Sequence, residues 1–185
     1  MLAVTKMPPN NTMEPTAAKR TACGTLVALL LGGGSWRTLG RNRMGMRQLE
    51  KSVMQLLLSG DEPALAALRA QYQVAEVESI ESSGMGAFVN YRIPDPAPLA
   101  SPANFVLEDI ELELEQIEHS VAVLLFVRDG KLSMLEFAAI VGPWPEEPRI
   151  RKLGYLAALP AGSNTFSFVP VANRDAKTLR RALAA

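Results

Sequence analysis

The residues best suited to chemistry lie in LEDIELELEQIEH, residues 107–119, with five glutamates, one aspartate and the only histidine of this 185-residue chain. Carboxylates and an imidazole can bind a divalent cation or exchange protons with a substrate. Glu111, Glu113 and Glu115 alternate with apolar residues, which predicts a β-strand with these glutamates on one face. Such alternation is also typical of the solvated face of an antiparallel sheet.

Strand register decides which of these side chains meet. A three-residue hairpin loop at 116–118 would place Glu115 opposite His119 and Glu111 opposite Val123. One sheet face would then carry Glu111, Glu113, Glu115, His119 and Glu136, and the core face would carry Leu112, Ala122 and Phe137. A two-residue loop would send the glutamates to the other face, because side chains alternate along a strand.

Two functional readings of this face are possible, and both have a simpler alternative. His119 with Glu115 or Glu118 would make an acid/base pair, with Ser120 or Ser133 as nucleophile, but no G-x-S-x-G element accompanies them. One histidine and one cysteine leave no common zinc-ligand set. We therefore expect a charged strand face with no metal or cofactor. Glu136 stands apart, because it interrupts an apolar run and is a candidate buried carboxylate.

The strongest local signal is a β-hairpin in VAVLLFVRDGKLSMLEFAAIV, residues 121–141. Asp129-Gly130 suits a two-residue type I′ turn, whose central positions both need positive φ. Uninterrupted pairing from this turn joins Arg128 to Lys131, Val127 to Leu132, Leu125 to Met134 and Val123 to Glu136.

The remaining elements predict an α+β fold, an N-terminal helical hairpin packed on a mostly antiparallel sheet. Apolar residues at helical spacing predict helices after Met46 and after Asp61, a natural N-cap, with Ser59-Gly60 between them. Period-two patterns predict strands near 74–80, 87–93, 149–151 and 165–169. The four prolines of 94–102 predict an extended loop, and Asn173 could cap a final helix.

Charge divides the chain into two parts. Residues 1–47 contain seven basic residues and one acidic residue, a net charge of +6, whereas residues 48–185 contain 12 basic and 18 acidic residues, a net charge of −6. An acidic domain repels phosphate, so we expect no nucleic-acid binding and favour a basic protein as partner. The single Cys23 excludes an intramolecular disulfide and fits a reducing compartment.

Residues 1–45 read as a disordered leader, and three origins are open for it. We favour an over-extended start, with translation beginning at Met44 or Met46 and the protein in the cytoplasm. The alternatives are a functional tail and an export signal within residues 1–35, although no A-x-A-like cleavage site follows its apolar run. That uncharged run, residues 21–36, is shorter than the roughly 20 apolar residues of a membrane span. We divide the rest into one domain, 46–172, and a C-terminal tail, 173–185, with no pattern that specifies an oligomeric state.

Several motifs within residues 46–147 resemble those of a known group of proteins. GMGAFVNYRIPDPAP, DIELELEQIEHSVAVLLFVRDGKLSMLEF and PWPEE resemble a group of small uncharacterised bacterial proteins with a G-x-G-x-F strand, an E-H strand, an F-V-x-D-G-x-L-S-x-L-E hairpin and a W-P-E segment. The resemblance implies a common α+β fold and these domain boundaries, and it implies no activity.

We therefore expect a small acidic protein-binding module, of inhibitor or immunity type, that acts through an acidic sheet face. Its expected contact residues are Glu111, Glu113, Glu115, His119, Glu136 and Trp144. Trp144 either anchors a partner from the surface or folds over the core edge, and Arg149, Arg151 and Lys152 are candidates to neutralise the acidic face. The alternative is a small hydrolase that uses Glu136 and His119.

Overall fold

The computed structural model describes residues 37–38, 43–158 and 168–184, all within one compact unit, residues 33–185. Predictions for the leader fall almost entirely outside these ranges, and so does most of the strand predicted at 165–169. They stay predictions. Within the described ranges, no helix is both long enough and apolar enough to cross a membrane.

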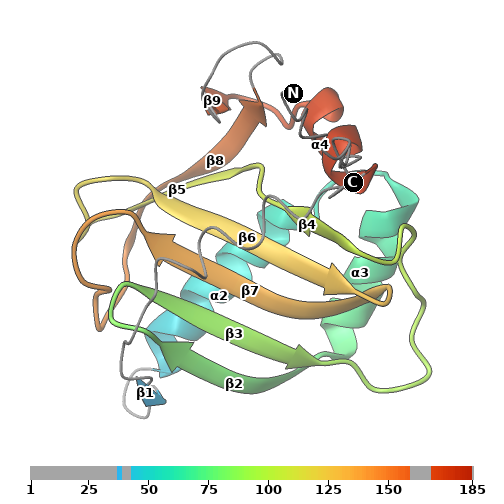
Figure 1. Ribbon diagram of the computed structural model, residues 1–185, viewed down its shortest axis with the longest axis horizontal. Helices are drawn as coiled ribbons and strands as arrows, with labels where there is room; N and C mark the ends of the chain where they lie inside the picture. The colour runs from blue at the N-terminus through green and yellow to red at the C-terminus, as the bar shows by residue number, and fades with distance from the viewer. Residues whose placement is uncertain (1–36, 39–42, 159–167, 185) are drawn as a thin grey trace, which may run out of the picture. The chain divides into compact units, whose positions relative to one another are not determined.

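The chain has the predicted α+β architecture, with a helical hairpin on one face of an antiparallel sheet (Figure 1). The helices are α2 (Arg43–Leu57), α3 (Pro63–Val74) and α4 (Ala176–Leu183). The described strands are β1 (Arg37–Thr38), β2 (Glu76–Ser82), β3 (Gly86–Arg92), β4 (Phe105–Leu107), β5 (Ile110–Leu114), β6 (Val121–Arg128), β7 (Lys131–Ala139), β8 (Ile150–Ala158) and β9 (Phe168–Val171). They follow the order β1-β2-β3-β7-β6-β5-β8-β9, with β4 also paired to β6.

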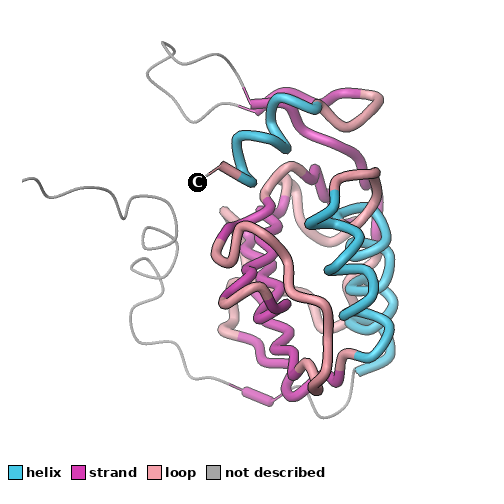
Figure 2. Tube along the Cα trace, turned by 90° about the vertical axis from the view of Figure 1, so that its right-hand side faces the viewer, coloured by secondary structure: helices cyan, strands magenta, loops and turns pink. Residues whose placement is uncertain are grey.

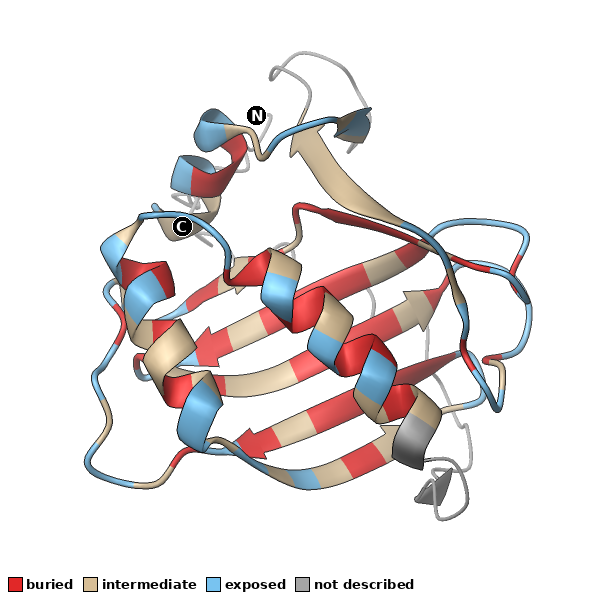
Figure 3. Cartoon of the chain, turned by 180° about the vertical axis from the view of Figure 1, so that it is seen from behind, coloured by how far each residue is buried: buried red, intermediate tan, exposed pale blue. Residues whose placement is uncertain are grey.

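The helices α2 and α3 cover the same face of the sheet (Figures 2 and 3). Their apolar stripes pack against Val89, Leu125, Leu135 and Phe137, all fully buried. The described residues place no helix over the opposite face, which we call the outer face. The core therefore lies between the helices and one sheet surface, and the outer face is the surface whose role needs an explanation.

The ends of the helices differ in detail from the sequence prediction. Gly60, with φ of 116°, lies in the turn that follows the end of α2, as expected. The predicted N-cap Asp61 is wrong, because Glu62 occupies that position without a side-chain cap bond and Pro63 begins α3. Arg69 instead donates to the carbonyls of Leu58 and Gly60 at 2.6 and 2.7 Å. The C-terminal end of α2 is thus satisfied by a side chain of α3.

The Asp129-Gly130 turn is confirmed, with φ of 51° and 73°, but the predicted pairing fails beyond its second pair. The register shifts between Phe126 and Val127, so Ser133 is an extra residue on β7. Leu124 therefore faces Glu136, Val123 faces Phe137, and Leu125 faces Leu135. The shift keeps Val123, Leu125, Leu135 and Phe137 in the core, and it places Ala122 on the outer face, contrary to the prediction.

The predicted three-residue loop between β5 and β6 is also wrong. Leu112 faces Val121, and the longer turn between the strands buries Ile117 in the core. Burial of this isoleucine accounts for the extra turn residues, because a tight loop would expose it. The glutamates of β5 instead face β8, with Glu111 opposite Gly154 and Glu113 opposite Lys152.

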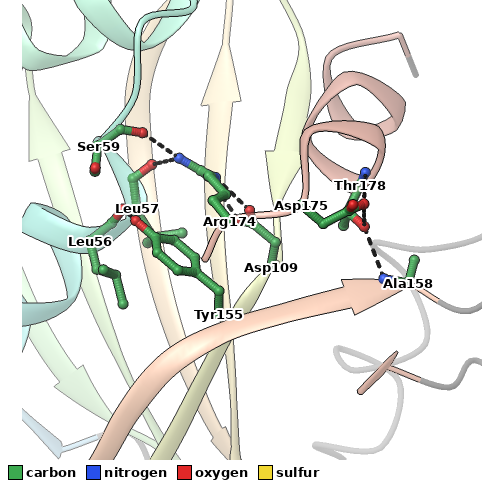
Figure 4. A network of polar contacts seen from close by, with 9 residues as sticks. All are labelled: Leu56, Leu57, Ser59, Asp109, Tyr155, Ala158, Arg174, Asp175 and Thr178. Carbon is green, nitrogen blue, oxygen red and sulfur yellow. Dashed lines mark hydrogen bonds and ion pairs between the residues drawn. The ribbon is translucent and has the colours of Figure 1, made fainter. Parts of the chain in front are cut away.

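The C-terminal segment is held against the sheet by Arg174 (Figure 4). Its guanidinium donates to both carboxylate oxygens of Asp109 at 2.6 and 2.8 Å, and to the carbonyls of Leu57 and Ser59 at 2.8 and 2.7 Å. Tyr155 lies under the guanidinium, 5.6 Å from ring centroid to Cζ. The predicted helix after this point is confirmed as α4, but its cap is different.

Asp175, and not the predicted Asn173, is the N-cap of α4. Its carboxylate accepts from the backbone N–H and the hydroxyl of Thr178 at 2.7 and 2.8 Å. These bonds, the backbone one first, lower the pKa of Asp175 below its ordinary value. The Thr178 hydroxyl oxygen also accepts from the backbone N–H of Ala158 at 2.9 Å, which ties α4 to β8.

Candidate functional site

A row of four side chains crosses the centre of the outer face. Glu81 on β2 pairs with Phe88 on β3, Phe88 with Glu136 on β7, and Glu136 with Leu124 on β6. Residues directly opposite each other in an antiparallel pair point to the same side of the sheet. These four residues, the outer-face row, therefore combine two carboxylates with an aromatic and an aliphatic side chain.

Glu136 is the unusual member of the outer-face row. It is 5% exposed, between Phe88 at 8% and Leu124 at 6%. Among the described residues it has neither a hydrogen-bond donor nor a counter-charge, and its burial raises the pKa of its carboxyl. The side chain is largely buried, but its carboxylate oxygens are not among the described side-chain atoms that are buried without a partner, so they keep some contact with solvent.

Glu81 lies in a more polar setting at the other end of the row. One of its carboxylate oxygens accepts from the Ser79 hydroxyl at 2.7 Å and from the Asn90 amide at 3.3 Å. The Asn90 amide also donates to the Ser79 hydroxyl oxygen at 2.8 Å. This network orients the Glu81 side chain, and its donors among the described residues, an amide and a hydroxyl, carry no positive charge.

The three predicted glutamates of β5 and its following turn are all paired with basic side chains. Glu111 meets Lys152 at 2.7 Å, Glu113 meets Arg151 at 3.0 Å, and Glu115 meets Arg149 at 3.3 Å. The hydrogen bond to Glu111 raises the pKa of Lys152. The basic residues thus neutralise the acids, one of the expected roles, and this part of the face is a ladder of alternating charge.

His119 and Glu136 are not brought together. His119 is exposed in the turn before β6. Glu136 is buried in the middle of β7, and its cross-strand partner Leu124 is five residues further along the chain than His119. His119 therefore lies outside the outer-face row, and the acid/base pair expected for a hydrolase is not assembled.

Trp144 follows the second of its two expected alternatives and folds over the core edge. It is 8% exposed, with its ring 5.8 Å from the ring of Phe137. Its backbone N–H donates to the Gly84 carbonyl at 2.7 Å, and its Nε1 is buried without an acceptor among the described residues. Trp144 is therefore a core residue and not a surface anchor.

Sequence reasoning missed Glu50, a buried carboxylate of α2. Glu50 is fully buried, and one oxygen accepts from the hydroxyls of Tyr72 and Tyr91 at 2.8 and 2.7 Å. Arg47 donates to the other oxygen at 3.1 Å. Burial and then the Glu50 charge raise the pKa of both tyrosines well above their ordinary value.

The signal for Glu50 was its spacing, four residues after Met46 and three before Val53, which is within the buried stripe. The environments of Glu50 and Glu136 differ, and so do the roles that we assign to them. Glu50 has three donors and works as a structural link between α2, α3 and β3, whereas Glu136 has none. No three His, Cys, Asp or Glu side chains of the described ranges converge in a way that would hold a metal ion.

Comparisons with known proteins do not assign this site. No family model, no curated protein and no solved structure matches the chain. The resemblance of its motifs to a group of small bacterial proteins therefore remains an expectation, and the candidate site rests on its own geometry. On that geometry, the candidate site is the outer-face row together with the neighbouring ion pairs of Glu111, Glu113 and Glu115.

Proposed function

We propose that this chain is a protein-binding module whose contact surface is the outer face of its sheet. The observation that carries the proposal is Glu136, a largely buried glutamate that lies between two apolar side chains and has no counter-charge among the described residues. A carboxylate with little water around it gains from a positively charged group, and a bound partner can supply one.

Two further properties support a positively charged partner. Residues 48–185 carry a net charge of −6, which speeds encounter with a basic protein. The ion pairs of Glu111, Glu113 and Glu115, which we call the β5 ladder, lie on the same face, and basic residues on or just before β8 already neutralise them. In this proposal, their alternating charges set the orientation of the bound partner. An inhibitor or immunity-type role in the cytoplasm, without a cofactor, is the form of this proposal that we favour.

Site-specific photocrosslinking in the native host tests the contact surface. Met134 is a partly exposed residue of the outer face, opposite Asn90 and Phe126. Replacing it with p-benzoylphenylalanine should give a discrete adduct with one protein, identified by mass spectrometry. The matched control is the same replacement at Gln73, an exposed position of α3 on the far side of the molecule. Equal adducts at both positions, or none at 134, would overturn the proposal.

Affinity measurement with the identified protein makes the test quantitative. Ala138→Arg puts a bulky positive charge on the outer face, and we expect it to weaken binding at least about tenfold, because it both obstructs the surface and repels a basic partner. Gln73→Arg adds the same charge to α3 and should leave the Kd unchanged. Circular dichroism of both variants checks that each retains its fold.

The alternative function is a hydrolase that uses Glu136 and His119. Burial raises the pKa of Glu136, as general acid catalysis at neutral pH requires. The exposed turn position of His119 supplies no second catalytic group beside it, so binding is better supported than catalysis. A hydrolytic activity lost in both Glu136→Gln and His119→Gln would reverse this preference.

A further inference from the structure

We propose that the free edge of β2 binds an extended, positively charged segment of the partner as an additional strand of the sheet. This inference rests on the proposed function for the basic character of the partner, and it adds a second contact surface beside the outer face. The segment would form backbone hydrogen bonds along β2, and its basic side chains would lie beside the carboxylates of that strand.

The edge of β2 is open along most of its length. Beyond β2, at the lower border of the sheet in Figure 1, β1 pairs only with Ser82 and Glu81. From Glu76 to Ile80, no described residue pairs with the side of β2 that faces away from β3. The backbone N–H and C=O groups of such an edge can bind another extended chain.

The pairing of β1 shows that this edge accepts an extended segment. Arg37 and Thr38 pair with it in antiparallel register, and both belong to residues 1–47, whose net charge is +6. The chain therefore already places part of its own basic region along an acidic strand. A segment of the partner would occupy the rest of the edge, from Ile80 to Glu76.

The charges along β2 favour a basic occupant. The strand carries Glu76, Glu78 and Glu81 and no basic residue. Glu76 forms an ion pair with Arg92 of β3, whereas Glu78 is exposed and has no ion pair among the described residues. Opposite charges on neighbouring strands attract and like charges repel, so a basic segment gains from this edge and an acidic one is rejected.

The same charges argue against a second copy of the chain as the occupant. In an antiparallel pair of two β2 strands, each copy would bring three glutamates to the contact, and they would repel one another. The strand at the other end of the sheet, β9, is a poorer site because it has four residues and contains Pro170, which has no N–H to donate. We therefore assign the partner segment to β2.

The test uses the full chain and three synthetic peptides. The probe is an acetylated heptapeptide, Thr-Lys-Val-Arg-Val-Lys-Thr-amide, and its charge control carries glutamate at the three basic positions. A backbone control keeps the basic side chains but is methylated at two adjacent backbone nitrogens, which removes a donor from each edge of the peptide strand. Calorimetry should give at least about tenfold tighter binding for the probe than for either control. NMR titration should place the largest amide shift changes at residues 76–80.

A charge reversal on β2 locates the effect. Glu78→Lys changes an exposed side chain of the edge, and we expect it to weaken probe binding about fivefold or more, because it puts a positive charge beside the basic peptide. Glu118→Lys is the matched control. It changes the net charge by the same amount at an exposed position of the turn between β5 and β6, and it should leave the Kd unchanged. Circular dichroism checks that both variants retain the fold.

Equal binding of the probe and either control, no binding of the probe, or equal effects of the two charge reversals would overturn the β2 site. A chain that sediments as a dimer and dissociates when the probe binds would show a second copy on this edge instead. Failure of the β2 site is distinguishable from failure of the proposed function. If Ala138→Arg weakens binding of the crosslinked protein and Glu78→Lys does not, the partner uses the outer face alone. If neither variant affects that protein, both proposals fail.

Discussion

At the scale of single residues, two of the buried glutamates, Glu50 and Glu136, are chemically opposite. Glu50 is fully buried with three donors, and Glu136 is buried with none among the described residues. A satisfied buried charge stabilises the arrangement around it, whereas an unsatisfied one opposes folding. The sequence alone suggested that Glu136 is buried, because it interrupts an apolar run. It could not show whether a donor reaches it, since that depends on strands distant in the chain.

We expect Glu136→Gln to stabilise the free chain at neutral pH, because burial disfavours the charged carboxylate and the amide carries no charge. Burial raises the folded-state pKa of Glu136 above its ordinary 4.5, so the folded chain holds this proton more tightly than the unfolded chain. Stability therefore falls as pH rises from the unfolded pKa through the raised folded value. Urea unfolding of both proteins at several pH values checks this, with an advantage for the variant that appears only above about pH 4.5.

Glu50→Gln should have the opposite effect and destabilise the fold by about 2–4 kcal/mol, because it leaves Arg47 without its counter-charge and weakens two tyrosine hydrogen bonds. Urea unfolding at pH 7 measures the loss. Glu115→Gln, at an exposed ion pair, should change stability by less than about 0.5 kcal/mol. Equal effects of the two substitutions would contradict the structural role of Glu50.

At the scale of elements, local patterns predicted the helices, the Asp129-Gly130 turn and most strands, because these depend on residues near each other in sequence. The pairing of β5 with β8 was not predictable in this way, because the paired residues, such as Glu111 and Gly154, are far apart in the sequence. β4 was missed altogether because three residues, Phe105–Leu107, are too few to show a period.

Arg174→Met should release α4 from the rest of the fold. The substitution keeps a long apolar side chain but removes four hydrogen bonds, two to Asp109 and one each to the carbonyls of Leu57 and Ser59. It also leaves Asp109 buried without its counter-charge, so we expect a loss of about 3–5 kcal/mol. Hydrogen exchange should accelerate in α4 more than in β6. Unchanged protection of α4 would show that Thr178 and Leu179 hold this helix without Arg174.

At the scale of the whole molecule, charge acts at two ranges. On the proposed function, the net −6 of residues 48–185 would attract a basic partner from a distance, against the net +6 of residues 1–47, and the outer-face row would act only on contact. We expect the association rate to fall several-fold as salt rises from about 0.05 to 0.5 M, with a much smaller change in the dissociation rate. Surface plasmon resonance with the crosslinked protein measures both. A dissociation rate that rises as steeply as the association rate falls would show that the contact itself is solvent-screened.

The extra residue of β7 has an evolutionary consequence. Because the Phe126–Met134 and Val127–Leu132 pairs lie on either side of Ser133, a chain that loses this one residue keeps Glu136 opposite Leu124. A loss of residue 135 or 136 is different, since it exchanges the two surfaces of the strand beyond that point and turns Phe137 outward. Related chains should therefore differ in length at 133 far more readily than at the positions just after it, so the bulge is a place where the hairpin can change length without changing what it presents.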